Sequence, residues 1–227
     1  MMIIITGSSG GIGLKLTELL SKYNKILGIY QKNKPKKKLY NVKFIKCNLF
    51  EKSQIKLLEK KIRNEKKIIF ISLAGIKENN LLVNQSDEKI QNMLDLNIKS
   101  NIMLSKMLLK KMVFSKWGRL IFFSSTGASR GDIGISVYAA TKTSLIGFSK
   151  VLSKEYGKYN ITSNILDLGA FDAGMYRKLK KDSKKKILEN LPNKELGNIK
   201  NIALAVKFLM ENDFVNGSVI KLDGGAD

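Results

Sequence analysis

The sequence predicts an α/β domain built on one doubly wound parallel sheet of about seven strands, with helices on both faces. Short apolar runs rich in β-branched residues alternate with longer segments of helical spacing, which is typical of parallel strands joined by right-handed crossovers. The strand runs are almost continuously apolar, as expected for strands buried on both faces. The chain has 227 residues, 44% of them hydrophobic, and no repeat or linker divides it. We therefore expect one domain over residues 1–227.

The elements follow from the local pattern. Residues 2–5 read as a buried strand, and a glycine-rich turn leads from it into a helix over 12–22 with leucines at helical spacing. The remaining strands are expected at 26–30, 42–47, 68–75, 119–125, 161–166 and from 218 onward. The remaining helices are expected at about 51–63, 86–114, 137–156 and 198–211. The lysine-rich stretch 170–197 is expected to be irregular and to lie above the sheet as a substrate lid.

The composition excludes several classes of site. The chain has no histidine, so Ser-His-Asp catalysis, Cys-His catalysis and histidine-ligated metals are excluded. Its one cysteine, Cys47, allows neither an intramolecular disulfide nor a cysteine-rich zinc site, and we expect no metal. No apolar run approaches the roughly 18 residues of a membrane helix, and the first residues lack the features of a signal peptide. We expect a cytoplasmic protein that does not bind membranes.

The formal net charge of +22 raises the possibility of nucleic-acid binding. Of the 41 basic residues, however, only four are arginine, the residue that nucleic-acid readers usually employ. The lysines are spread along the chain, and a compositional bias explains them together with the abundant asparagine and isoleucine. We expect no specific nucleic-acid partner. The rival hypothesis of a nucleic-acid binder predicts strongly salt-dependent DNA binding without cofactor binding.

The glycine-rich turn, TGSSGGIG at residues 6–13, joins the first strand to the first helix. Gly7 suits the tight turn, Gly11 lets the backbone approach a pyrophosphate, and Gly13 lets the helix pack close to the sheet. The N-terminus of the helix then offers free N–H groups and a positive dipole end to an anion. In this strand–turn–helix context the motif predicts a dinucleotide site rather than a plain turn.

A second motif, VYAATK at residues 137–142, places Tyr138 and Lys142 on one face of a helix. A free phenol has a pKa of about 10 and is a poor acid–base group at neutral pH. A lysine ammonium nearby, together with a cationic nicotinamide ring, favours the phenolate and lowers that pKa. The pair therefore predicts a phenol that exchanges a proton with a substrate oxygen.

The two motifs together resemble the short-chain dehydrogenase/reductase family over nearly the whole chain. Further matches are LAG at 73–75, LDLNIKS around Asn97, GRLIFFSS ending at Ser125 and LDGG at 222–225. The resemblance implies a Rossmann-type fold and a divergent member similar to the 3-oxoacyl-[acyl-carrier-protein] reductases. Divergence is evident where Ala173 stands in place of a threonine that commonly bonds the nicotinamide carboxamide, at a cost of roughly 1 kcal/mol.

The resemblance also implies roles for individual residues. Ser125 would hydrogen-bond the substrate oxygen, with Ser124 as the competing assignment, while Tyr138 would exchange the proton. Lys142 would hold the nicotinamide ribose, and Asn97 would hold a water in a proton relay behind Lys142. The glycine turn and the resemblance together predict these cofactor-binding residues: Gly7, Ser9, Gly11, Ile12, Gly13, Lys32, Asn48, Leu49, Ala74, Gly75, Tyr138, Lys142, Gly169 and Phe171.

The choice of cofactor depends on the loop after the second strand. An acidic residue there would bind the adenosine ribose diol and select NAD, but this chain reads IYQKNKPKKK with Lys32 as the first cation. A cationic loop suits a 2′-phosphate, so NADP is expected. NAD stays possible, because the lysines also fit the general bias and Gly10 stands where NADP-using relatives often carry a basic residue.

These features predict an NADP(H)-dependent oxidoreductase that reduces a ketone to a secondary alcohol through a Ser-Tyr-Lys site. A 3-oxoacyl thioester, small or carrier-bound, is the favoured substrate. The alternatives are a sugar or nucleotide-sugar in surface polysaccharide biosynthesis, or a non-catalytic dinucleotide-binding protein. The positive lid suggests an anionic substrate, although the lysine bias explains it as well. We expect a homodimer or homotetramer assembled through the helices at 86–114 and 137–156.

Overall fold

The computed structural model describes residues 1–62, 64–174 and 176–226. Its described part contains a seven-stranded parallel sheet in the order β3-β2-β1-β4-β5-β6-β7, which confirms the predicted fold class. The strands are β1 Met2–Thr6, β2 Lys25–Tyr30, β3 Val42–Lys46, β4 Ile68–Ser72, β5 Gly118–Ser125, β6 Ile161–Leu168 and β7 Val219–Leu222.

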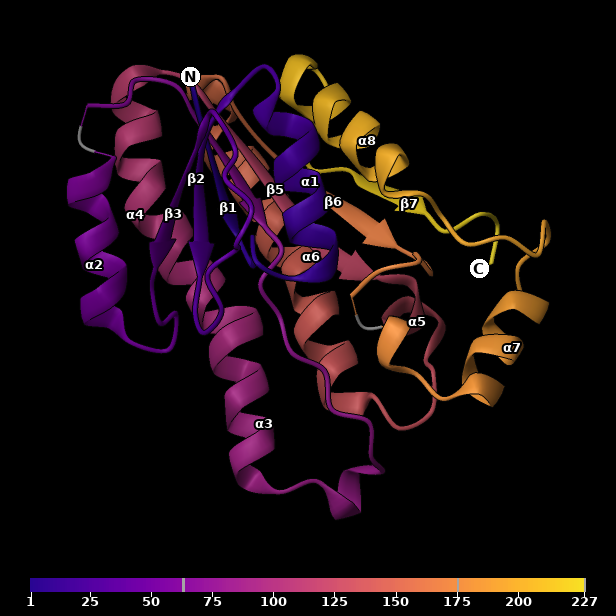
Figure 1. Ribbon diagram of the computed structural model, residues 1–227. Coiled ribbons are helices and arrows are strands. Elements are labelled where there is room, and N and C mark those ends of the chain that lie inside the picture. Colours follow the sequence, from indigo (N-terminus) through magenta and orange to yellow (C-terminus); the bar gives the residue numbers. More distant parts are fainter. Residues whose placement is uncertain (63, 175, 227) are drawn as a thin grey trace.

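Helices cover both faces of the sheet (Figure 1). The first face carries α1 Gly11–Ser21 and α8 Ile199–Glu211. The second face carries α2 Lys52–Lys61, α4 Ser100–Ser115 and α6 Ser136–Tyr156. The other helical elements are α3 Asp87–Leu94, α5 Thr126–Arg130, α7 Lys181–Glu189 and the short turns η1 Leu82–Asn84, η2 Asp95–Lys99, η3 Gly157–Tyr159 and η4 Tyr176–Lys178. None of the described helices has the length and apolarity needed to cross a membrane.

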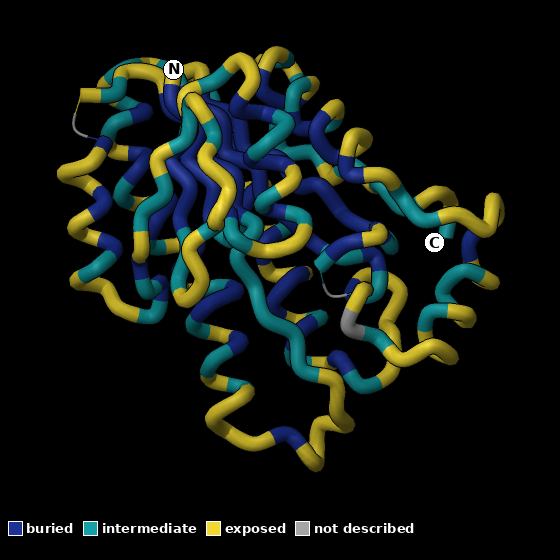
Figure 2. The backbone as a smooth tube through the Cα atoms, viewed as in Figure 1, coloured by how far each residue is buried: buried dark blue, intermediate teal, exposed yellow. Residues whose placement is uncertain are grey.

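The two helical layers bury two separate cores, because successive strand residues point to opposite faces of the sheet. In β1, Ile4 packs toward α2, α4 and α6, whereas Ile3 and Ile5 pack toward α1 and α8. Phe70 and Phe122 meet edge to face in the former core, with their ring centroids 6.0 Å apart. Figure 2 shows the central strands as the most buried part of the chain.

The helical stretch expected over 86–114 is present and runs from Asp87 to Ser115, but it is not one regular α-helix. The structure has α3, then the π-helical turn η2, then α4. The Ser100 N–H donates to the carbonyl of Asp95, five residues back, so this turn holds one residue more than an α-helical turn. The inserted turn contains Asn97, whose carbonyl accepts a hydrogen bond from the Asn101 side chain at 2.8 Å. The residues here are ordinary for a helix, so local periodicity does not indicate the insertion.

The irregular conformation expected over 170–197 is wrong for residues 181–189, which form α7. Leu191, just after α7, is buried and lies against Gly224, so the C-terminal segment anchors this end of the helix. Other boundaries move by a few residues: β4 ends at Ser72, and β6 continues to Leu168. Residue 63, at the end of the expected helix 51–63, and residue 175, in the expected lid, lie outside the described residues.

The Phe70–Phe122 contact predicts a large loss of stability for Phe122→Ala. Phe122 is fully buried and also contacts Phe148 at 5.7 Å between ring centroids, so truncation leaves a cavity. We expect unfolding free energy to fall by about 3–5 kcal/mol in urea denaturation. The matched control is Phe214→Ala, because Phe214 is 96% exposed and its removal should change stability by at most ~0.5 kcal/mol. Equal losses for the two variants would contradict this packing.

Candidate functional site

The candidate site lies at the carboxyl edge of the sheet, where the strand order reverses between β1 and β4. In open α/β sheets such a reversal leaves a crevice at which ligands bind. The segments after β1, β4, β5 and β6 all leave the sheet at this edge, because the strands are parallel. These segments, with η2 and α6, carry most of the residues that the sequence predicts for the site.

The glycine turn is held by very close backbone packing. Gly7 has a φ of 69°, and a Cβ there would lie 2.9 Å from the Ala74 nitrogen. A Cβ on Gly13 would lie 2.1 Å from the Gly7 carbonyl oxygen, and one on Gly11 would lie 2.4 Å from the Gly174 nitrogen. Gly11 therefore faces the segment after β6. Its contact with a pyrophosphate stays a prediction.

The start of α1 fits an anionic cofactor group. Gly10 is the N-cap and makes no side-chain capping bond, and the first turn of α1 contains no acidic residue. The amides of Gly11, Ile12 and Gly13 therefore point out of the helix end without helical acceptors, beside the positive end of the helix dipole. Ser9 is half-buried in the same turn. This cradle suits a pyrophosphate on the chemistry of its donors.

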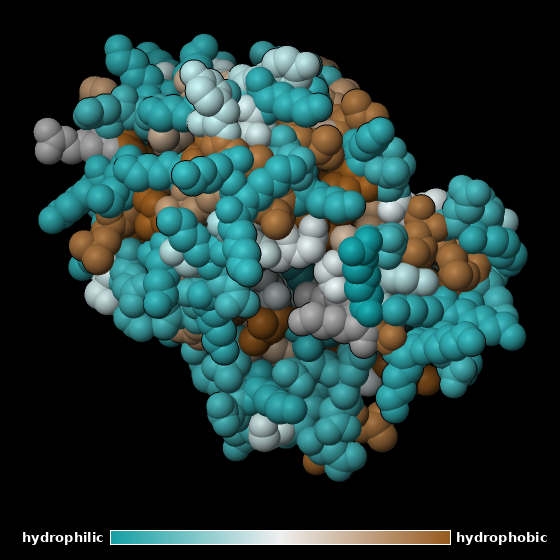
Figure 3. Space-filling view, viewed as in Figure 1, coloured by the Kyte–Doolittle hydropathy of each residue, from teal (hydrophilic) through white to brown (hydrophobic). Residues whose placement is uncertain are grey.

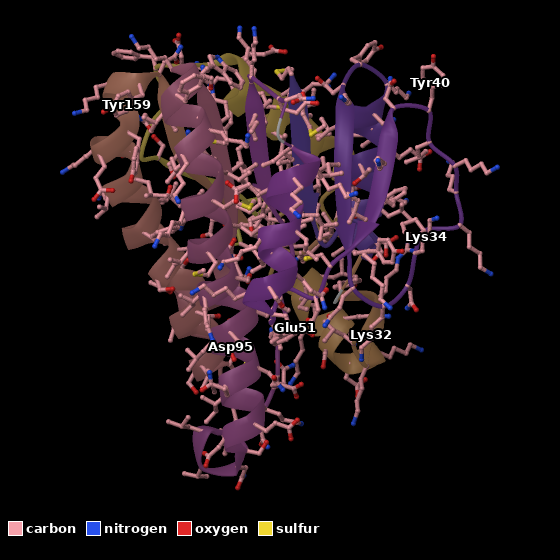
Figure 4. All side chains as sticks on the ribbon, turned by 90° about the vertical axis from the view of Figure 1, so that its left-hand side faces the viewer. Lys32, Lys34, Tyr40, Glu51, Asp95 and Tyr159 are labelled. Carbon is pink, nitrogen blue, oxygen red and sulfur yellow. The ribbon has the colours of Figure 1, made fainter. Side chains whose placement is uncertain are left out.

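The expected adenosine end lies after β2 and β3. The Asn48 side-chain oxygen already accepts hydrogen bonds from Gln31 Nε2 at 2.9 Å and from the Phe50 N–H at 3.3 Å. An adenine amine would have to compete with these donors, so the predicted Asn48 contact stays a prediction. Leu49 is buried in the core. In Figure 4, Lys32 and Glu51 lie toward this end of the sheet, and Lys34 lies further along the sheet edge.

Ser125, Tyr138 and Lys142 come together although they belong to β5 and α6. The hydroxyl of Ser125, the last residue of β5, lies close enough to the Tyr138 phenol to lower its pKa by hydrogen bonding. Lys142 follows one turn later on α6, and its Nζ donates to the Phe123 carbonyl at 2.9 Å and lies 5.8 Å from the Tyr138 ring centroid. An ammonium has three N–H donors, so two remain for a ligand. Ser124 instead contacts the Lys142 carbonyl at 3.4 Å.

Burial dominates the electrostatics of this group. It raises the pKa of Tyr138, and the buried Asp167 carboxylate raises that pKa further, while the hydrogen bond with Ser125 lowers it. Burial lowers the pKa of Lys142 to about 8, and Asp167 opposes this shift. With no ligand bound, the phenol is therefore held in its protonated form. A further positive charge beside it would favour the phenolate.

Asn97 connects the inserted turn of η2 to the loop after β4. Its Oδ1 accepts from the Ile76 N–H at 2.9 Å, and its Nδ2 donates to the Ile76 carbonyl at 2.9 Å and to Thr141 Oγ1 at 3.0 Å. A Cβ on Gly75 would lie 3.2 Å from Asn97 Oδ1 and 3.5 Å from Lys142 Nζ. Asn97 is fully buried and positions this loop beside Lys142. Its role in a water relay stays a prediction.

Gly169 and Phe171 follow β6 at the carboxyl edge of the sheet, and both make contacts within the protein. The Gly169 N–H donates to the Leu222 carbonyl at 2.9 Å and joins the ends of β6 and β7. Phe171 is buried, and its ring packs against Gly197 at the far end of the expected lid. Ala74, which follows β4, contacts Gly7. Contacts of these residues with a cofactor stay predictions.

Sequence reasoning missed several residues of this site. Thr6 Oγ1 accepts hydrogen bonds from the N–H groups of Leu73 and Ala74, both at 3.1 Å. Asp167, buried in β6, accepts from Ser129 Oγ at 3.0 Å and acts on both Tyr138 and Lys142. The signal available for Asp167 was an acidic residue between two leucines at the end of a strand. Thr6 gave no such signal, because threonine is common in strands.

The sequence matches the family model described as short chain dehydrogenase over residues 1–184. It is 33% identical to the 3-oxoacyl-[acyl-carrier-protein] reductase FabG of Rickettsia typhi, with 98% of this chain and 95% of the relative covered. It is 33% identical to the FabG of Haemophilus influenzae, covering 98% and 96%, and 32% identical to that of Escherichia coli K12, covering 98% and 95%.

The depressed pKa of Lys142 predicts a pH dependence of stability. Between about 8 in the folded protein and the ordinary value of 10.5, the unfolded chain binds more protons, so folding becomes more favourable as pH rises. Lys142→Met removes this contribution. We expect the stability of the variant relative to the wild type to fall by up to ~3 kcal/mol between pH 8 and 10.5 in urea unfolding. Parallel stability curves for the two proteins would contradict the shift.

Proposed function

The chain belongs to the short-chain dehydrogenase family and is an oxidoreductase, and on this premise we propose that it is an NADP(H)-dependent ketone reductase. The proposed substrate is a 3-oxoacyl thioester, free or bound to a carrier, which becomes a 3-hydroxyacyl thioester. The activity of the relatives supports this choice, since they are 3-oxoacyl-[acyl-carrier-protein] reductases.

The observation that carries the proposal is the placement of the half-buried Ser125 beside the buried Tyr138, whose pKa it lowers, with the Lys142 ammonium one turn further along α6. A nicotinamide cofactor, when bound, supplies the hydride for reduction. Tyr138 would donate its proton to the ketone oxygen while Ser125 holds that oxygen. The two spare donors of Lys142 would hold ribose hydroxyls, and its charge would stabilise the phenolate left on Tyr138.

The phosphate preference is proposed from charge and position. Lys32 is exposed and directly follows Gln31 after β2, where a 2′-phosphate on the adenosine ribose would lie. Lys37, further along the same loop, is already paired with Glu18 at 2.5 Å. Hydrophilic side chains cover most of the face seen in Figure 3, so the loop contributes to a broadly polar, cationic surface. NADP is therefore the proposed cofactor.

Assembly into a homodimer or homotetramer is part of the proposal. Four apolar side chains on the segments expected to form the interface are exposed in the single chain: Leu94, Ile102, Phe114 and Val151. Burial between subunits would remove this apolar surface from water.

The segment 170–197 is proposed as the substrate lid, and a cytoplasmic location remains part of the proposal.

Replacing Tyr138 tests the chemistry. Tyr138→Phe removes the acid–base hydroxyl and keeps the ring, so NADPH-dependent ketone reduction should fall about 10²–10⁴-fold. NADPH binding, measured by fluorescence titration, should stay within about twofold of the wild type, since only the hydroxyl is lost. Tyr156→Phe, at the far end of α6, serves as the control. Unchanged ketone reduction in the Tyr138 variant would contradict the proposed role.

Replacing Lys32 tests the cofactor preference. Lys32→Ala should weaken NADPH binding about fivefold at low salt, as expected for the loss of one exposed charge pair, and should leave NADH binding unchanged. Lys60→Ala removes an equally exposed lysine from α2 and should change neither affinity. Preference of the wild type for NADH would refute the phosphate assignment. Failure to bind either cofactor would refute the reductase proposal itself.

A further inference from the structure

A second cation lies beside Tyr138. Lys77 follows Gly75 by two residues on the loop between β4 and α3, and its Nζ lies 5.4 Å from the centroid of the Tyr138 ring. Lys142 Nζ lies at a similar distance, 5.8 Å, from the same centroid. The catalytic roles proposed above use Lys142 and leave Lys77 unassigned. Two ammonium groups within 6 Å of one phenol ring therefore need separate explanations.

The charge of Lys77 is poorly compensated by the protein. The side chain is half-buried, and burial lowers its pKa, while Asp132 opposes that shift from a distance. The Asp132 carboxylate is engaged by Arg130, which donates to both of its oxygens at 2.9 and 3.2 Å. The neighbouring carboxylate of Glu78 pairs with Lys89 at 3.1 Å. Among the described residues, no ion pair within 4.0 Å joins Lys77 to an acid.

Lys77 and Lys142 differ in access. Lys142 is buried, and its ammonium donates to the carbonyl of Phe123 in β5, so the protein fixes the position of this ammonium. Lys77 is only half-buried and sits on a loop, so its ammonium is open to an incoming molecule. A partly desolvated cation without an anionic partner binds an oxygen acceptor strongly, and an anion most strongly. The ligand that can supply this acceptor is the one that reaches Tyr138.

We propose that Lys77 is a substrate-binding residue that holds a second substrate oxygen, carried two carbons from the ketone that is reduced. This inference rests on the proposed function and assigns the residue that would recognise the second oxygen of its 3-oxo substrate. A 1,3-dicarbonyl can turn both of its oxygens to one side, so one can reach Tyr138 and Ser125 while the other reaches Lys77. The second oxygen comes from a carboxylate in a 3-oxo acid, or from a carbonyl in a 3-oxoacyl ester or thioester.

A competing role for Lys77 makes a different prediction. A cation near a phenol also favours the phenolate, so Lys77 could act on Tyr138 alone. In that case its removal would slow the reduction of every ketone to the same extent. In the proposed role, removal affects only substrates with the second oxygen. Probes that share a methyl ketone and differ in the group two carbons away therefore distinguish the two roles.

The test compares acetoacetate, methyl acetoacetate and 2-pentanone as probes for NADPH-dependent reduction by the wild type and by Lys77→Met. We expect kcat/KM to fall about tenfold or more for a probe whose second oxygen Lys77 binds, and to stay within about twofold for 2-pentanone. A loss with acetoacetate alone identifies a carboxylate, and a loss with the ester as well identifies a carbonyl. Lys60→Met, which removes an exposed lysine from α2 and leaves the Glu78–Lys89 pair intact, should affect no probe.

Equal losses on all three probes, or no loss on any, would overturn the proposal. A binding measurement separates this result from failure of the reductase function. Calorimetric titration of acetoacetate and methyl acetoacetate into the NADP-loaded protein should show affinity that drops about tenfold in Lys77→Met and largely returns in Lys77→Arg. Such a loss without turnover would support the Lys77 site and refute the reductase. Failure of the wild type to bind either probe would overturn the Lys77 site.

Discussion

The arrangement of the site depends on one close approach, where the ends of β1 and β4 meet at the reversal of strand order. Thr6 Oγ1 accepts hydrogen bonds from two successive amides, those of Leu73 and Ala74, and so satisfies both where β4 leaves the sheet. Gly7 lies directly against Ala74, and Gly13 lies against Gly7. No side chain larger than hydrogen fits at these positions without movement of the backbone. The N-terminus of α1 and the loop carrying Gly75 are therefore held at a fixed separation. This separation positions the proposed pyrophosphate site.

Buried polar groups extend this constraint across the site. Asn97 hydrogen-bonds both backbone groups of Ile76 and reaches Thr141 on α6, so it joins the loop after β4, the inserted turn and the helix bearing Tyr138. The π-helical turn makes this possible, because its extra residue turns Asn97 inward without unwinding α4. Buried amides that lose their partners are costly, so the network also resists rearrangement when ligands exchange.

Desolvation and charge act in opposite directions on Tyr138. Burial and Asp167 hold the phenol protonated, which suits the proposed proton donor, whereas the Lys142 ammonium would stabilise the phenolate that donation leaves behind. The two lysines near Tyr138 differ in their surroundings. The Phe123 carbonyl accepts a hydrogen bond from the ammonium of Lys142, whereas Lys77 is half-buried without an acidic partner and is the proposed site of a substrate oxygen.

Local pattern alone determined the strand–helix alternation, the glycine turn and the placement of Tyr138 and Lys142 one helical turn apart, because each depends on residues close together in the chain. The local pattern did not predict the inserted turn at Asn97, the helix α7 within the expected lid, or the positions of Lys77 and Asp167 near Tyr138. Those features arise from contacts between residues tens of positions apart. A lysine in a polar loop and an aspartate in a strand acquire their electrostatic roles only when the folded chain removes water from around them.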